Sequence, residues 1–139
     1  MMAMNSSYSG FVQGGVRTTL QVEGFTVLAV SVAFYAALHA NWWLFGALFL
    51  APDIAFLAYL ANPRAGAIAY NTLHSYIAPL ILGMFAYFGN LPQCLPVSVI
   101  WMAHIGFDRA LGYGLKYGSA FGATHLGYKG RPRHNADTA

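Results

Sequence analysis

The sequence predicts an all-α membrane protein, with four transmembrane helices in an up-down bundle. Of its 139 residues, 58% are hydrophobic and only 8% are charged, whereas soluble domains carry about 25% charged residues. Residues 24–52 and 65–107 contain no Asp, Glu, Lys or Arg. Each of these runs is longer than the roughly 20 apolar residues that cross a bilayer. The length fits one compact domain.

The limits of the four predicted helices follow from the apolar segments and from the turn signals between them. We expect transmembrane helices over residues 22–40, 43–60, 67–88 and 95–117. Pro52 lies inside the second helix and removes one backbone hydrogen bond, which predicts a kink beside Asp53. Asn62-Pro63 ends this helix, because the residue before a proline avoids the α conformation.

Three regions follow from this division of the chain. A polar N-terminal tail is expected over residues 1–21, and the transmembrane domain over 22–117. Residues 118–139 form a Gly- and aromatic-rich segment with a basic tail. Cys94 is the single cysteine of the chain, which excludes an internal disulfide and a cysteine-based metal cluster.

The basic residues predict the orientation. The first and third turns contain no Lys or Arg, whereas the two tails, the second turn and the end of the fourth helix do. They are Arg17, Arg64, Lys116, Lys129, Arg131 and Arg133. By the positive-inside rule, both termini are expected in the cytoplasm, and the protein in the cell membrane as a multi-pass protein. The basic tail is expected to touch anionic lipids. A nucleic-acid partner is not expected, because basic residues do not cluster on a folded face.

Four ionisable side chains are predicted to lie at similar depths in the cytoplasmic half of the membrane. Asp53, His74 and Asp108 lie roughly 10–12 Å below the cytoplasmic surface, counted at 1.5 Å per helical residue. His104 lies one turn deeper and shares a helix face with Asp108. We interpret these four as candidate catalytic residues, with one Asp as the acid and one His as the base.

Other residues are candidates for binding a ligand. Arg109 would anchor a polar or anionic head group, and it is expected to pair with Asp53 or Asp108. Asn71, Tyr113 and Glu23 are further candidate binding residues. His125 has no partner in the sequence, and we expect it to be exposed.

The same four ionisable residues allow a metal site and a purely structural role. Two imidazoles and two carboxylates suit iron, manganese or zinc. However, no dense signature such as His-Glu-x-x-His is present, and the sequence alone therefore assigns no metal. In the structural interpretation, the histidines hydrogen-bond between helices and a carboxylate neutralises Arg109.

A stripe of small residues occupies every fourth position at the end of the fourth predicted helix. It consists of Gly106, Ala110, Gly114 and Gly118. Such spacing lets a neighbouring helix come close in a membrane. A second copy of the chain or another protein is a possible partner for Gly106, Ala110 and Gly114.

Several motifs resemble those of a known bacterial family. They are Ala51-Pro52-Asp53, Tyr70-Asn71 with His74, the segment from His104 to Tyr117, and Thr124-His125-Leu126-Gly127. The resemblance is to the small membrane proteins named domain of unknown function 4260, and it covers about residues 20–128. It implies a small multi-pass membrane protein and no particular activity, cofactor or catalytic residue.

Two classes of function therefore compete. The first is an acid/base enzyme of isomerase or cyclase type that acts on an apolar substrate dissolved in the membrane. The alternative is a non-enzymatic membrane component, such as an assembly partner, a lipid-binding module or a permeation or proton path.

Overall fold

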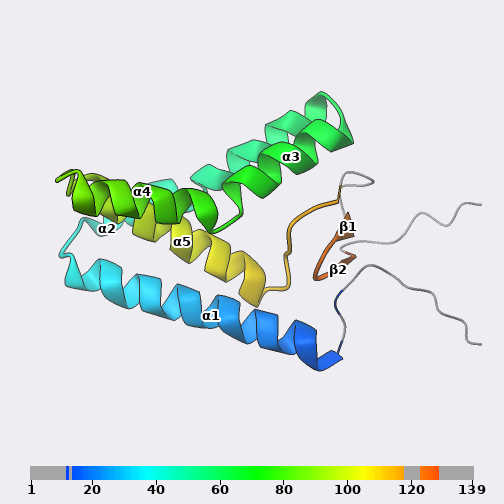
Figure 1. The fold of residues 1–139 in the computed structure, drawn as a ribbon, viewed down its shortest axis with the longest axis horizontal. Coiled ribbons are helices and arrows are strands. Elements are labelled where there is room, and N and C mark those ends of the chain that lie inside the picture. Colours follow the sequence, from blue (N-terminus) through cyan, green and yellow to red (C-terminus); the bar gives the residue numbers. More distant parts are fainter. Residues whose placement is uncertain (1–11, 13, 118–122, 129–139) are drawn as a thin grey trace, which may run out of the picture.

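The computed structural model describes residue 12 and residues 14–117 and 123–128, and most of this part of the chain is helical (Figure 1). The elements are α1 (Gly14–Ala37), α2 (Trp42–Phe49), the 3-10 helix η1 (Ala51–Leu60), α3 (Pro63–Leu73), α4 (Ile77–Phe88), α5 (Cys94–Ala110), β1 (Ala123–Thr124) and β2 (Gly127–Tyr128). The two short strands pair in antiparallel register. The predicted all-helical class is confirmed for the apolar part of the chain.

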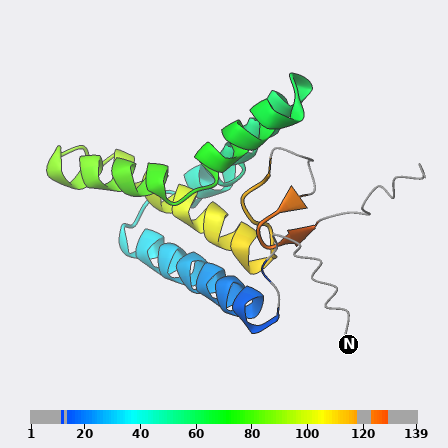
Figure 2. The same cartoon turned by 45° about the vertical axis from the view of Figure 1, so that its right-hand side comes forward.

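Helix α5 lies at the centre of the arrangement. Helix α1 runs alongside it, α4 and α2 also pack on it, and η1 and α3 pair with each other and extend away from α1 (Figures 1 and 2). The buried core joins Tyr35 of α1 to Val99 and Ile100 of α5. Apolar side chains from α2 and from the turn before it surround this core. The fold therefore places α5 where residues from several elements can reach it.

Helices α1 and α5 approach closely because both carry glycine at the crossing. A Cβ atom on Gly106 would lie 2.7 Å from the carbonyl oxygen of Gly24, and one on Gly24 would lie 2.4 Å from Cβ of Arg109. A Cβ atom on Gly114 would lie 2.5 Å from Nδ1 of His125. Gly106 and Gly114 thus pack within the chain, while Gly118 lies outside the described residues.

The third predicted helix, 67–88, is wrong as one continuous element. Helix α3 ends at Leu73 and α4 begins at Ile77. Pro79 has no N–H to donate to the carbonyl at position 75, and its ring crowds that carbonyl. Side chains of α5 bind the carbonyls that the break leaves free. Trp101 Nε1 donates to the oxygen of Leu73 at 2.6 Å, and Arg109 Nη2 donates to the oxygen of His74 at 2.7 Å.

The other predicted limits differ less. The second segment changes from an α-helix to a 3-10 helix at Ala51, next to the proline that predicted a kink. Helix α1 begins at Gly14, inside the predicted polar tail. Helix α5 ends at Ala110 instead of residue 117, and Gly112 follows with φ of 83°, a conformation that glycine adopts without steric cost.

Within the described residues, two helices are long and apolar enough to cross a membrane. They are Gly14–Ala37 and the combined segment Trp42–Leu60, with mean hydropathies of 1.5 and 1.7. Helices α3 and α4 contain 11 and 12 residues and are individually too short for this, because a span needs about 20 residues.

Candidate metal centre

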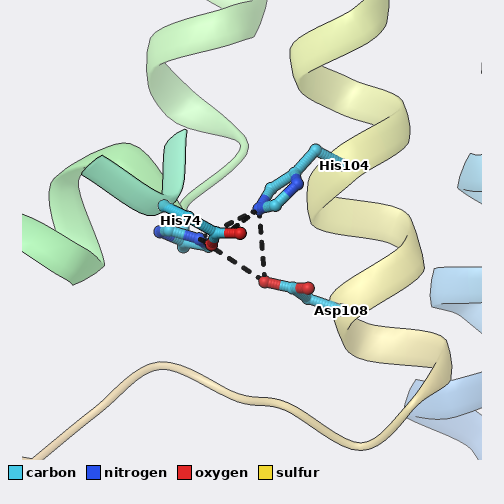
Figure 3. Close-up of side chains that lie close together, drawn as sticks. His74, His104 and Asp108 are labelled. Atoms are coloured by element: carbon cyan, nitrogen blue, oxygen red, sulfur yellow. Dashed lines mark hydrogen bonds and ion pairs between the residues drawn. The ribbon is translucent and has the colours of Figure 1, made fainter. Parts of the chain in front are cut away.

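Four candidate residues from three parts of the fold meet at one point. Asp53 comes from the first turn of η1, His74 caps the C-terminus of α3, and His104 and Asp108 lie one turn apart on α5. One ligand atom from each of the four lies within 4.8 Å of all the others. Figure 3 shows His74 facing His104 and Asp108. The structure therefore brings together the side chains that the sequence placed at similar depths.

The distances between the ligand atoms are nearly equal. His104 Nε2 lies 3.1 Å from His74 Nε2. Asp53 Oδ1 lies 3.2 Å from His74 Nε2 and 3.4 Å from His104 Nε2. Asp108 Oδ2 lies 3.4 and 3.5 Å from the same two nitrogens. A tetrahedral zinc ion with ligands at about 2.0–2.1 Å would set them about 3.4 Å apart. Five of the six edges thus match a small tetrahedral ion.

The tautomer of His74 leaves a lone pair pointing into the cluster. His74 Nδ1 lies 3.0 Å from the carbonyl oxygen of Tyr70. A carbonyl can only accept, so Nδ1 carries the proton and Nε2 of the neutral ring is an acceptor. Nε2 faces two carboxylate oxygens, which are also acceptors. Such a meeting of lone pairs needs a cation or a shared proton between them.

The short distance between the two imidazoles favours a metal ion over protons. If both histidines were protonated, two N–H groups would face each other across 3.1 Å and repel. A single shared proton would leave the two carboxylates only partly neutralised. A divalent cation balances the two carboxylates and uses all four lone pairs.

Tyr70 supports the cluster from its own helix. Its ring stacks on His74 with centroids 3.7 Å apart, and its hydroxyl donates to Asp108 Oδ2 at 3.3 Å. Tyr70 is buried and lies four residues before His74 on α3. The sequence analysis did not include it in the site, although its i,i+4 spacing from His74 was visible.

The cluster is closed on one side and open on the other. Both histidine side chains are buried, whereas the side chains of Asp53 and Asp108 are 34% and 13% exposed. Phe49 packs edge-on against His104, with ring centroids 5.4 Å apart. Nδ1 of His104 is buried without a hydrogen-bond partner among the described residues. Access to the centre is therefore from the carboxylate side.

Arg109 does not form the predicted ion pair. The ion pairs found between described residues join only the two histidines to Asp53 and Asp108. The buried guanidinium instead donates to the carbonyl oxygens of His74 and Tyr113, at 2.7 and 2.8 Å. The expectation failed because α3 breaks at His74 and offers free carbonyls to Arg109. Tyr113 thus contributes its backbone to this contact, and Glu23 lies on the wall of a separate cavity.

Asn71 holds the segment that follows α5. Its Nδ2 donates to the oxygen of Lys116 at 2.8 Å, and the N–H of Lys116 donates to its Oδ1 at 2.6 Å. Lys116 is buried, and its Nζ lies 4.8 Å from the centre of the Tyr70 ring. Asn71 thus anchors the chain beside the cluster.

Replacing Asn71 by alanine is expected to lower the free energy of unfolding by about 2 kcal/mol, because two hydrogen bonds are lost at about 1 kcal/mol each. Thermal melting in detergent measures the change. Thr72→Ala is the matched control, since Thr72 is exposed and its hydroxyl bonds only to the carbonyl of Ile68 one turn earlier. Equal melting temperatures of the two variants would contradict the anchoring role.

His125 is not exposed as expected. It is half-buried, and its Nδ1 accepts the N–H of Leu115 at 2.8 Å. Burial lowers the pKa of His125, and the charge of Arg109 lowers this pKa further. The neutral ring therefore carries its proton on Nε2, where it can donate a hydrogen bond.

Comparison with known proteins gives one match. A family model described as a domain of unknown function (DUF4260) matches residues 17–128. Searches of curated proteins and of solved structures found no significant match. The matched range contains all four residues of the cluster.

Proposed function

The chain belongs to the DUF4260 family, and we propose from its geometry that it is a multi-pass membrane protein with a zinc-type metal centre. In this proposal Asp53, His74, His104 and Asp108 bind the ion. Zinc fits because its ligands are N, O or S atoms in a tetrahedron, without a further geometric preference. The observation that carries the proposal is the set of five ligand-to-ligand distances between 3.1 and 3.5 Å.

The outward surface supports the membrane location. Helix α4 exposes more than half of six large apolar side chains, namely Ile77, Leu80, Ile81, Met84, Phe85 and Phe88. On α1, Val22, Phe25 and Val30 are similarly exposed. Water disfavours continuous apolar patches of this kind, whereas lipid accommodates them. We propose four membrane-crossing segments with both termini in the cytoplasm, in which α3 and α4 together form the third.

As a catalyst, the centre would act on an apolar substrate dissolved in the membrane. A bound zinc ion is a Lewis acid that polarises a substrate oxygen, as an isomerase or cyclase reaction requires. Asp53 is the most exposed of the four ligands, and we expect it to give way to the substrate. The Tyr70 hydroxyl beside Asp108 is the adjacent proton donor.

A non-enzymatic role is the second candidate, and one observation favours it. Protein side chains supply all four corners of the tetrahedron, as in structural zinc sites, whereas catalytic sites keep one position open. In that case the ion would hold η1, α3 and α5 together. The two roles differ in what happens to the fold when the metal is removed.

We expect the purified full chain to retain about one zinc ion per chain, because four preformed ligands of this kind typically bind zinc tightly. Mass spectrometry of metals in protein purified from zinc-supplemented cells measures this. X-ray absorption should show only nitrogen and oxygen ligands at about 2.0–2.1 Å. Failure to retain any divalent metal, and to take one up on dialysis, would overturn the proposal.

Chelation then separates the two roles. A chelator-treated protein that melts at the same temperature as the zinc form favours the catalytic role. A large fall in the melting temperature favours the structural role, because metal binding then contributes to folding.

A further inference from the structure

A second cavity lies outside the metal centre. Its volume is about 870 Å³, and it is formed by the N-terminal half of α1, residues 75–77 at the helix break, Arg109, Leu115 and His125. Pockets that hold small molecules usually measure about 300–1,000 Å³. None of the four metal ligands lines it.

Arg109 brings an unneutralised charge to this cavity. The residue is only 7% exposed, and two of its N–H groups donate to backbone carbonyls. Carbonyls orient a guanidinium but leave its charge unbalanced, and a buried charge is costly unless it is paired. The described residues offer Arg109 no ion pair. A guanidinium has five N–H donors, so further donors are available for a ligand.

His125 adds a second donor without adding a charge. Its Nδ1 is engaged by the N–H of Leu115, which fixes the proton of the neutral ring on Nε2. Together, Arg109 and His125 suit a phosphate or carboxylate group.

The remaining wall is mostly apolar and selects for a ligand with a tail. Leu20, Val22, Val27, Ile77 and Leu115 line it. Glu23 also lies on the wall, but it is exposed, so water screens its charge far more than that of the buried Arg109. The cavity thus combines a net positive, donor-rich region with an apolar surface.

We propose that this cavity binds an amphiphile with an anionic phosphate or carboxylate head group, held by Arg109 and His125, and with its apolar tail along α1. This site is distinct from the metal centre and stands whether or not the proposed metal function holds. Arg109 links the two places, because it also donates to the carbonyl of the metal-ligand candidate His74.

The test measures binding of dodecyl phosphate to the full chain in neutral maltoside micelles by calorimetry, with empty micelles as the blank. We expect saturable binding with one site per chain. Inorganic phosphate and dodecanol should each bind at least about tenfold more weakly, because each lacks one half of the recognised chemistry.

Two variants make the site specific. Arg109→Gln is expected to weaken dodecyl phosphate binding by about tenfold or more, since a hydrogen bond to a charged group is lost. Because Arg109 also holds the helix break, Thr19→Trp provides a second variant that fills the cavity from an exposed position of α1. Val30→Trp is its matched control, since Val30 is exposed on the same helix and does not line the cavity.

The proposal is supported if Thr19→Trp loses binding while Val30→Trp retains it. Unchanged binding in Thr19→Trp would overturn it. Equal affinity for dodecanol would also overturn it, because the head group would then be irrelevant, and equal affinity for inorganic phosphate would overturn the role of the tail. The zinc content of each variant is measured in parallel, so failure of this site is distinguishable from failure of the metal centre.

Discussion

His104→Ala is expected to weaken zinc binding by about a thousandfold. Four-ligand zinc sites bind with about 10–16 kcal/mol, so one ligand contributes about 4 kcal/mol, or nearly three factors of ten. His104 is also the least replaceable ligand, because it is buried and comes from the central helix α5. Competition with a zinc-binding dye on the detergent-solubilised protein measures the affinity.

His39→Asn is the control for this experiment. His39 is exposed and has a φ of 51°, a backbone conformation that asparagine tolerates better than alanine does. The control should leave zinc affinity unchanged. If His104→Ala and His39→Asn bind zinc equally well, the ion lies elsewhere or is absent.

Gly24→Val is expected to lower the free energy of unfolding by about 3 kcal/mol, the upper end of the usual cost of overpacking. The first carbon of the new side chain would lie 2.4 Å from Cβ of Arg109 and 2.8 Å from the backbone nitrogen of Ala110. Helices α1 and α5 would have to separate, and a backbone cannot move aside as a flexible side chain can. The yield of folded protein and its melting temperature in detergent report the loss.

Gly46→Ala separates this effect from helix propensity. Gly46 lies in α2, and a Cβ atom there would meet nothing within 4 Å. Alanine is expected to stabilise the protein there by about 0.5–1 kcal/mol, because glycine is the weaker helix former. A similar melting temperature for Gly24→Val and Gly46→Ala would show that the crossing is not tightly packed.

The site was predictable from the sequence to the extent that it depends on depth and helix face. The chain has only four acidic residues, and two of them, Asp53 and Asp108, reach the cluster. A charged group in an apolar segment needs a partner, and a helix fixes how deep it lies. His104 and Asp108 also share a face by their spacing. These rules identify which residues meet without any knowledge of the contacts.

The contacts of Arg109 and the break in α3–α4 could not be predicted in this way. A proline in a predicted membrane helix predicts a kink or a break, and only tertiary contacts decide between them. Here the break is stabilised by Trp101 and Arg109 from α5, which are far away in sequence. The sequence pattern pairs charges with charges, and it has no means to indicate that a backbone carbonyl will take the place of a carboxylate.

The interruption between α3 and α4 also has a consequence for the order of assembly during synthesis. The carbonyls of Leu73 and His74 find their donors in Trp101 and Arg109, and the carbonyl of Pro79 finds its donor in Ser98. All three donors belong to the last helix to leave the ribosome. Irregular backbone inside a bilayer is tolerated only where protein or water satisfies it. A nascent chain that ends before residue 98 therefore holds an incomplete third segment, which stays at the membrane surface or in the insertion machinery until α5 arrives.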